Sequence, residues 1–145
     1  MGLTVVVYEN KNNIKVDLSN RVTQVDTDTG EIYSDDIDFY KSYPKETFIA
    51  IKKRLGNISA IGNIFDEIKS IIENPNSIVL NGILYSGVHS GDTIPVTQLD
   101  SLKNELHLIK ERTKGKRSSL LDDFLLNMEA VLNEARKQNN PIVFV

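Results

Sequence analysis

The apolar residues of this 145-residue chain recur with two different periods, and this change of period constrains the fold most. Residues 3–8 are apolar and largely β-branched, and residues 14–18 alternate between apolar and polar side chains. The first pattern indicates a strand buried on both faces, and the second indicates a half-buried strand. From residue 58 onward, apolar residues recur at intervals of three and four, which is typical of amphipathic helices. We therefore expect one α+β domain spanning residues 1–145.

The strands are expected to form antiparallel hairpins at the N-terminus and to be joined by a strand from the C-terminus. Their expected ranges are residues 3–8, 14–18, 22–27, 31–33 and 142–145. Asn10-Lys11-Asn12-Asn13 supplies turn chemistry between the first two strands. Gly30 can take the positive φ that a three-residue loop requires between the next two. The last strand is expected to lie beside the first.

About four helices are expected to pack against this sheet. Their expected ranges are residues 44–55, residues 58–72, residues 99–109, and a last helix from Ser118 or Ser119 up to Asn139. Pro44 suits the first position of a helix, and Gly56 can end that helix. Residues 78–85 are apolar but are interrupted by Asn81-Gly82, which predicts a buried strand or a tight hairpin.

The composition excludes several kinds of chemistry. The chain has no cysteine, so thiolate nucleophiles, disulfides and zinc-thiolate sites are absent. Its formal charge of −3 argues against binding to nucleic acid or to a membrane surface, since both require a clustered positive field. Its two histidines are too few for a histidine-rich metal site. With no signal peptide and no run of 18 apolar residues, we expect a cytoplasmic protein without a metal or a cofactor.

The segment from Val22 to Tyr40 is the first candidate surface. It contains six acidic residues and no lysine or arginine, so its formal charge is −6, against −3 for the whole chain. Carboxylates steer a basic partner toward the surface and aromatic rings supply contact area. The predicted contact residues are Asp26, Asp28, Glu31, Tyr33, Asp35, Asp36, Asp38 and Tyr40. The alternative is a solvated loop whose aromatic side chains turn inward.

The second candidate surface is the polar loop of residues 86–95. His89 could act as the base for Ser90 or for a distant serine, with Asp92 as the orienting acid, which would suit a small hydrolase or transferase. Members of such a triad converge from separate parts of a fold, so a turn that caps the following helix is the favoured structural alternative. His89 and Asp92 are also predicted to contact a protein partner.

Two further motifs have simpler explanations. Asp28-Thr29-Gly30 matches the tripeptide of aspartic proteases, but polar residues precede it here and a hairpin turn accounts for it. Residues 110–117 include five basic residues, which could contact phosphate. An exposed link between two helices is the favoured interpretation, because basic side chains are stabilised at a helix C-terminus.

Three stretches resemble small bacterial proteins that include immunity proteins of polymorphic-toxin and contact-dependent inhibition systems. They are Met1-Gly2-Leu3 at the first strand, the segment from His89 to Pro95 with the helix start Leu99-Asp100-Ser101-Leu102, and Asn140-Pro141-Ile142-Val143-Phe144 after the last helix. Similar proteins often carry an acidic residue directly after the His-Ser pair, where this chain has Gly91. The resemblance implies an α+β protein that binds and blocks a toxin domain, and it implies no catalytic residue.

The leading hypothesis is therefore a non-enzymatic immunity protein that covers the active site of a cognate toxin. The surface of that toxin domain is expected to be basic. The rival hypothesis is a small hydrolase or transferase that uses His89, Ser90 and Asp92. A third hypothesis is a homo-oligomeric structural protein, with a homodimer as one form, built on the leucine seams of the last two helices.

Overall fold

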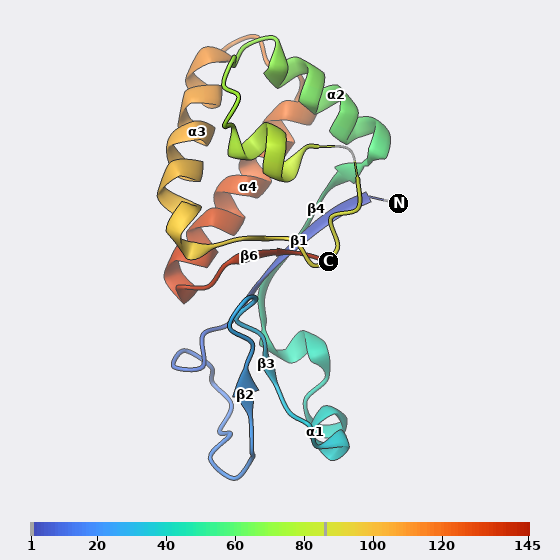
Figure 1. Ribbon diagram of the computed structural model, residues 1–145, viewed down its shortest axis with the longest axis vertical. Helices are drawn as coiled ribbons and strands as arrows, with labels where there is room; N and C mark the ends of the chain where they lie inside the picture. Colours follow the sequence, from blue (N-terminus) through green and yellow to red (C-terminus); the bar gives the residue numbers. More distant parts are fainter. Residues whose placement is uncertain (1, 86) are drawn as a thin grey trace.

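The computed structural model describes residues 2–85 and 87–145, and it has the α+β fold that the sequence predicts. The strands are β1 (Gly2–Tyr8), β2 (Gln24–Val25), β3 (Ile32–Tyr33), β4 (Ile49–Asn57), β5 (Thr93–Ile94) and β6 (Ile142–Phe144). The helices are α1 (Ile37–Ser42), α2 (Ile58–Lys69), α3 (Leu99–Arg112) and α4 (Ser119–Gln138), with the short turns η1 (Lys45–Phe48), η2 (Val79–Ile83) and η3 (Val96–Gln98). Figure 1 shows α2, α3 and α4 gathered at one end of the molecule.

Strand β1 lies inside the main antiparallel sheet, whose strand order is β4-β1-β6-β5. Val5 and Val7 face the larger core, which lies between the sheet and the helices. Val6 and Tyr8 lie on the opposite face and pack with Val143 of β6. The predicted burial of β1 on both faces is therefore confirmed, as is its pairing with the C-terminal strand.

Helices α2, α3 and α4 lie where the three-and-four spacing predicts them. The Asn57 side chain caps α2 by accepting a hydrogen bond from the N–H of Ala60 at 2.8 Å. Ser118 caps α4 in the same way by accepting from the N–H of Leu121 at 3.1 Å. Asn139 has a φ of 51°, a left-handed conformation that ends α4 as predicted.

The predicted strand at residues 14–18 is wrong, because these residues form no strand. Their turn does form, but it is held by α4 and not by a hairpin. Asn10 donates its N–H to Oε1 of Gln138 at 2.8 Å and its side-chain amide to the Gln138 carbonyl at 2.9 Å. Asn13 donates to the same Oε1 at 3.1 Å. These bonds direct the chain away from β1, which pairs with β4 instead.

The predicted helix at residues 44–55 is also wrong, since this segment contains η1 and most of β4. The register between β1 and β4 shifts twice, which leaves Ala50 and Leu55 without direct partners. Such bulges break the two-residue alternation of a strand. Ile49 and Ile51 consequently lie in different apolar clusters on opposite faces of the sheet. The irregular spacing that results imitates that of a helix.

Residues 78–85 form neither a strand nor a hairpin, so that prediction is wrong as well. They contain η2, a single wide helical turn in which the N–H of Leu84 donates to the carbonyl of Val79 at 2.8 Å. The Glu105 carboxylate of α3 accepts from the N–H groups of Ile78 and Val79 at 2.9 and 3.1 Å. A side chain from a distant segment therefore caps this turn.

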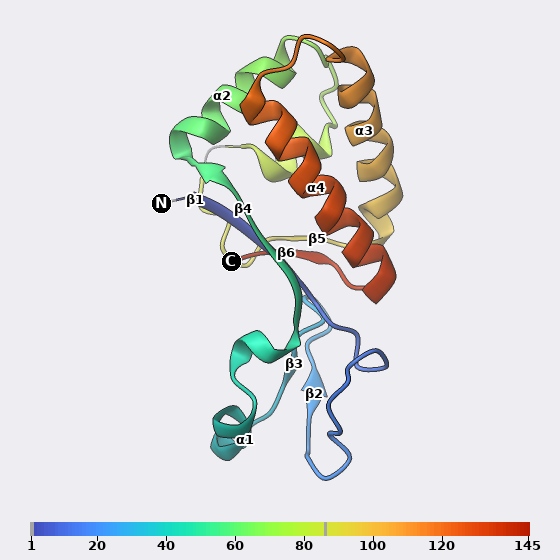
Figure 2. The same cartoon turned by 180° about the vertical axis from the view of Figure 1, so that it is seen from behind.

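Residues 9–48, between β1 and β4, form what we call the insert lobe, which contains α1 and lies at the opposite end of the molecule from α2, α3 and α4 (Figure 2). It has a core of its own, formed by Leu18, Ile32, Phe39 and Phe48. The predicted hairpin of β2 and β3 is confirmed, with a φ of 77° at Gly30 in its turn, but it forms a separate two-stranded sheet and does not join the C-terminal strand as expected. Asn140 donates its side-chain amide to the Tyr8 carbonyl at 2.8 Å and lies against Gly30.

Replacing Gly30 with alanine is expected to lower the free energy of unfolding by about 2 kcal/mol, since a left-handed backbone conformation is strained for any side chain. The new Cβ would also lie 2.5 Å from Oδ1 of Asn140. Gly115→Ala is the matched control, because Gly115 has a φ of 78° and open space around its Cα. Urea unfolding of both variants measures the difference. Equal losses would show that the contact with Asn140 contributes nothing.

Candidate functional site

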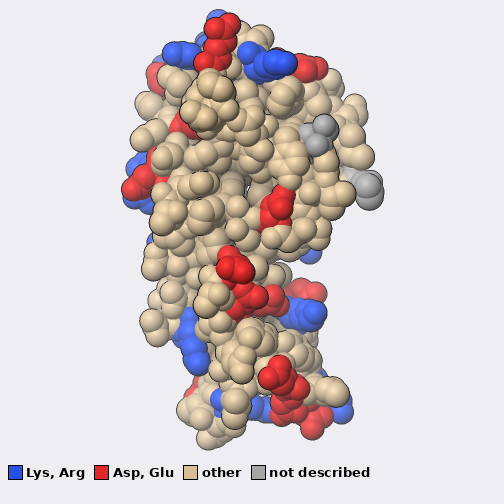
Figure 3. All heavy atoms as spheres, in the orientation of Figure 1, with Lys and Arg blue, Asp and Glu red and all other residues tan. Residues whose placement is uncertain are grey.

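The six acidic residues of the segment from Val22 to Tyr40 lie in two groups, one at the turn between β2 and β3 and one at the start of α1. Figure 3 shows acidic side chains at separate places on the insert lobe. The first group is Asp26, Asp28 and Glu31, and the second is Asp35, Asp36 and Asp38. The −6 charge of the sequence segment is therefore divided between two places.

The hairpin group partly serves the turn itself. Asp26 accepts hydrogen bonds from the N–H groups of Asp28 and Thr29 at 2.8 and 3.1 Å. Burial raises the pKa of Tyr8, and the nearby Glu31 and Asp26 carboxylates raise it further. Asp26 and Glu31 are half-buried and lie near the body of the protein, which leaves Asp28 as the exposed carboxylate of this group.

The group at α1 is more exposed. Asp36 caps α1 by accepting from the N–H of Asp38 at 3.0 Å. Asp38 forms an ion pair with Lys41 at 3.1 Å, and both side chains are largely exposed. Such surface pairs contribute little to stability. Asp35 is exposed and makes no side-chain hydrogen bond or ion pair with any described residue.

The aromatic side chains of this segment turn largely inward, as the structural alternative anticipates. Phe39 is fully buried, and Tyr40 packs edge-on against it with 5.2 Å between ring centroids. The Tyr40 hydroxyl accepts from the N–H of Ser34 at 3.3 Å. Tyr33 is half-buried and donates its hydroxyl to Gln24 at 2.6 Å. These rings mainly stabilise the insert lobe and leave little aromatic surface for contact with a partner.

Two aliphatic side chains that the sequence interpretation missed supply that area instead. Val22 is 85% exposed and Ile37 is 80% exposed. The buried Ser34 hydroxyl donates to the Val22 carbonyl at 2.9 Å and accepts from the N–H of Asp36 at 3.2 Å, so it joins the two segments. We call Val22, Asp35, Asp36 and Ile37 the acidic tip. The sequence signal that could have identified this exposed area is Ile37, which lies between two aspartates and fits neither a helical nor a strand period.

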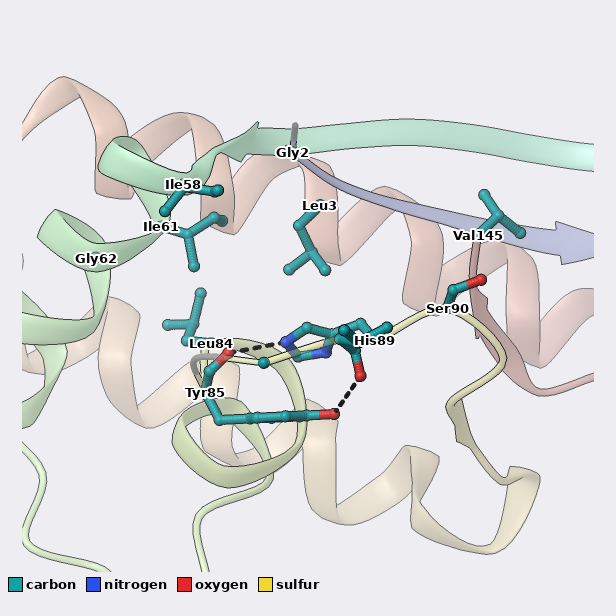
Figure 4. A pocket seen from close by; sticks show the side chains of 12 residues that line it. Gly2, Leu3, Ile58, Ile61, Gly62, Leu84, Tyr85, His89, Ser90 and Val145 are labelled. Carbon is teal, nitrogen blue, oxygen red and sulfur yellow. Dashed lines mark hydrogen bonds between the residues drawn. The ribbon is translucent and has the colours of Figure 1, made fainter.

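The triad proposed for the polar loop is not assembled. His89 Nε2 lies 2.8 Å from the Tyr85 carbonyl, to which it donates (Figure 4). The Asp92 carboxylate accepts a hydrogen bond from the hydroxyl of Tyr85, and this bond raises the pKa of Tyr85. Within the described residues, no hydrogen bond joins the side chain of His89 to that of Ser90 or of Asp92, and the one bond between His89 and Asp92 runs from the N–H of Asp92 to the carbonyl of His89 at 2.8 Å. Tyr85 is therefore the hydrogen-bond partner of both the His89 ring and the Asp92 carboxylate, which in a triad would bond to each other.

A cavity of about 450 Å³ lies beside His89, and Figure 4 shows it between the start of α2, the start of β1 and the polar loop. Its aliphatic walls are Leu3, Ile58, Ile61, Leu84, Val88 and Val145. The ring of His89 lies 3.9 Å from that of Tyr85 and 5.2 Å from that of Phe144, measured between centroids. His89 stands out in the sequence, but these walls do not, because they come from four separate segments.

Basic side chains of residues 110–117 form ion pairs and a hydrogen bond with other parts of the same protein. The first lysine of this segment pairs with Glu129 at 3.1 Å, and Arg117 pairs with Asp122 at 3.1 Å. Arg112 donates to the carbonyl of Ile71, just after the end of α2, at 3.3 Å. These contacts favour the interpretation of a link between α3 and α4 over a phosphate site.

Comparison with protein-family models, with curated proteins and with solved structures finds no match for this chain. Within residues 2–85 and 87–145, no three histidine, aspartate or glutamate side chains are grouped so that they could hold a metal ion. In the same residues, no helix combines the length and the apolar character needed to cross a membrane. The class that the fold defines is an α+β protein with an inserted lobe.

Proposed function

We propose that this chain is a non-enzymatic binding protein whose acidic tip contacts a protein partner with a basic surface. The observation that carries the proposal is the pairing of exposed carboxylates at Asp35 and Asp36 with the exposed side chains of Val22 and Ile37. Protein interfaces combine apolar contact area, which supplies affinity, with charges that steer association and select the partner. The tip offers both within one short stretch of surface.

The tip is held in shape before binding. The Ser34 hydroxyl links its two segments, and the aromatic side chains around Phe39 pack beneath α1. A surface that is already ordered loses less conformational entropy on binding. This ordering supports the role of a binding surface over that of a solvated loop.

The finer form of the proposal is an immunity protein that neutralises a bacterial toxin by covering its active site. The sequence resemblance described above supports this form, and the sign of the charge supports it too. A toxin that acts on nucleic acid presents a basic substrate-binding surface, which an acidic partner can occupy.

The test is co-purification with the product of the adjacent open reading frame, followed by measurement of the dissociation constant. The double variant Asp35→Lys with Ile37→Ser is expected to weaken binding about 30-fold, because it removes an apolar contact and reverses a charge. Glu111→Lys with Leu126→Ser is the matched control, since it makes the same changes of charge and apolar area on exposed positions of α3 and α4. No complex, or equal losses in both double variants, would contradict the proposal.

A further inference from the structure

We propose that the cavity beside His89 binds a small, uncharged molecule with an apolar body and a hydroxyl or N–H group. This site lies outside the acidic tip, and the inference does not rest on the proposed function. A volume of about 450 Å³ falls in the range of small-molecule pockets, which are mostly apolar with a few polar groups.

The side chains that line the cavity indicate that the ligand is uncharged. Aliphatic side chains dominate the walls, and the polar side chains among the described lining residues are those of Tyr85, His89 and Ser90. No lysine, arginine, aspartate or glutamate is among those residues. Burying an unpaired charge in such surroundings is costly, so an uncharged molecule fits best.

The mouth of the cavity is apolar as well. Ile58 is 68% exposed, Val88 is 86% exposed and Val145 is 51% exposed, and all three line the cavity. Scattered apolar side chains are common on protein surfaces, but a group around a cavity is typical of a binding site. These side chains would cover the apolar body of a bound molecule.

Gly62 gives an independent reason to regard this space as a binding site. It lies inside α2, where glycine weakens a helix relative to alanine. A Cβ built on Gly62 meets no atom within 4 Å, so packing does not require glycine here. Gly62 borders both this cavity and a neighbouring hollow of about 370 Å³ between α2 and η2. Its missing side chain leaves space at the border between them.

His89 indicates that the polar end of the ligand is a hydrogen-bond donor. Since Nε2 donates to the Tyr85 carbonyl, Nδ1 of the neutral ring is an acceptor. Among the described residues, this Nδ1 is the one buried side-chain nitrogen or oxygen without a hydrogen-bond partner. Buried polar atoms are nearly always satisfied, and a turn of the His89 ring, which lines the cavity, would bring this one to a ligand hydroxyl or N–H. Ser90 also lines the cavity, and its hydroxyl is a second polar group for the ligand.

The test uses N-phenyl-1-naphthylamine, an uncharged probe with one N–H whose fluorescence rises in apolar surroundings, and the full-length chain. The wild type is expected to bind it saturably with one site, and 1-decanol is expected to displace it. Gly62→Leu, which places a side chain in the cavity, is expected to weaken binding at least tenfold. Gly62→Ala is expected to have a smaller effect, and Ser101→Leu, on the exposed side of α3, none.

Two further measurements make the outcome decisive. Thermal unfolding establishes that Gly62→Leu is folded, which is expected because the new side chain enters open space. Decanoate, the charged counterpart of the alcohol, is expected to displace the probe at least tenfold less well than 1-decanol. Absence of saturable binding, equal binding by Gly62→Leu, or equal displacement by decanoate would overturn the inference.

Discussion

Replacing Phe39 with alanine is expected to unfold the insert lobe while α2, α3 and α4 remain folded. Phe39 is fully buried, and its ring centroid lies 5.2 Å from that of Tyr43 and 6.0 Å from that of Phe48. Truncating a buried phenylalanine costs about 3–5 kcal/mol. The lobe core has four buried side chains and is separate from the larger core, so we expect the loss to be local.

Hydrogen exchange measures this directly: residues 9–48 are expected to lose protection in Phe39→Ala, while α2, α3 and α4 keep theirs. Tyr40→Phe is the matched control, because it keeps the ring and removes only the hydrogen bond from the N–H of Ser34. That variant is expected to lose about 1 kcal/mol. Cooperative unfolding of the whole chain by Phe39→Ala would show that the two cores are a single unit.

The second large effect is expected from Glu105→Ala, which should lower the free energy of unfolding by about 3 kcal/mol. The carboxylate accepts from the hydroxyl of the buried Ser77 and from the N–H groups of Ile78 and Val79. Hydrogen bonds to a charged group are the stronger ones, and donors left without a partner keep their desolvation cost.

Urea unfolding at neutral pH measures the loss in Glu105→Ala. Glu111→Ala serves as the control, because Glu111 lies exposed on the same helix and makes no side-chain hydrogen bond with any described residue. It is expected to change stability by less than about 0.5 kcal/mol. If Glu105→Ala costs no more than its control, then η2 does not depend on this cap.

The sequence predicted those elements whose signals are local. The apolar spacing of α2, α3 and α4 survives in the structure because each helix buries one continuous face. The hairpin of β2 and β3 follows from Gly30, whose positive φ needs no distant partner. Strand β1 is apolar on both faces, and the pairing of β6 with it follows from the same composition.

The errors arise where distant residues decide the local structure. Gln138 holds the turn after β1, so residues 14–18 do not return along that strand. Bulges at Ala50 and Leu55 give β4 the spacing of a helix. Glu105 caps η2 from another helix. Neither a period nor a propensity within a short window contains this information.

The candidate site was predictable only in part. The sequence located the carboxylates, but it could not show that Asp26 stabilises a turn and that Asp36 caps α1. It also could not show that Val22 and Ile37 lie exposed beside them, since apolar residues are ordinarily expected inside. His89 was recognised as unusual, but its hydrogen bond to Tyr85 depends on the folded loop.

The central claim is that the acidic tip recognises a basic protein surface. The most direct measurement is the association rate constant with the product of the adjacent open reading frame, determined across a range of sodium chloride concentrations. We predict a rate that falls steeply with salt, and an Asp35→Lys rate that is about tenfold lower at low salt and depends less on salt. Glu111→Lys should behave as the wild type. A rate that is insensitive to salt, or one that Asp35→Lys leaves unchanged, would contradict the account.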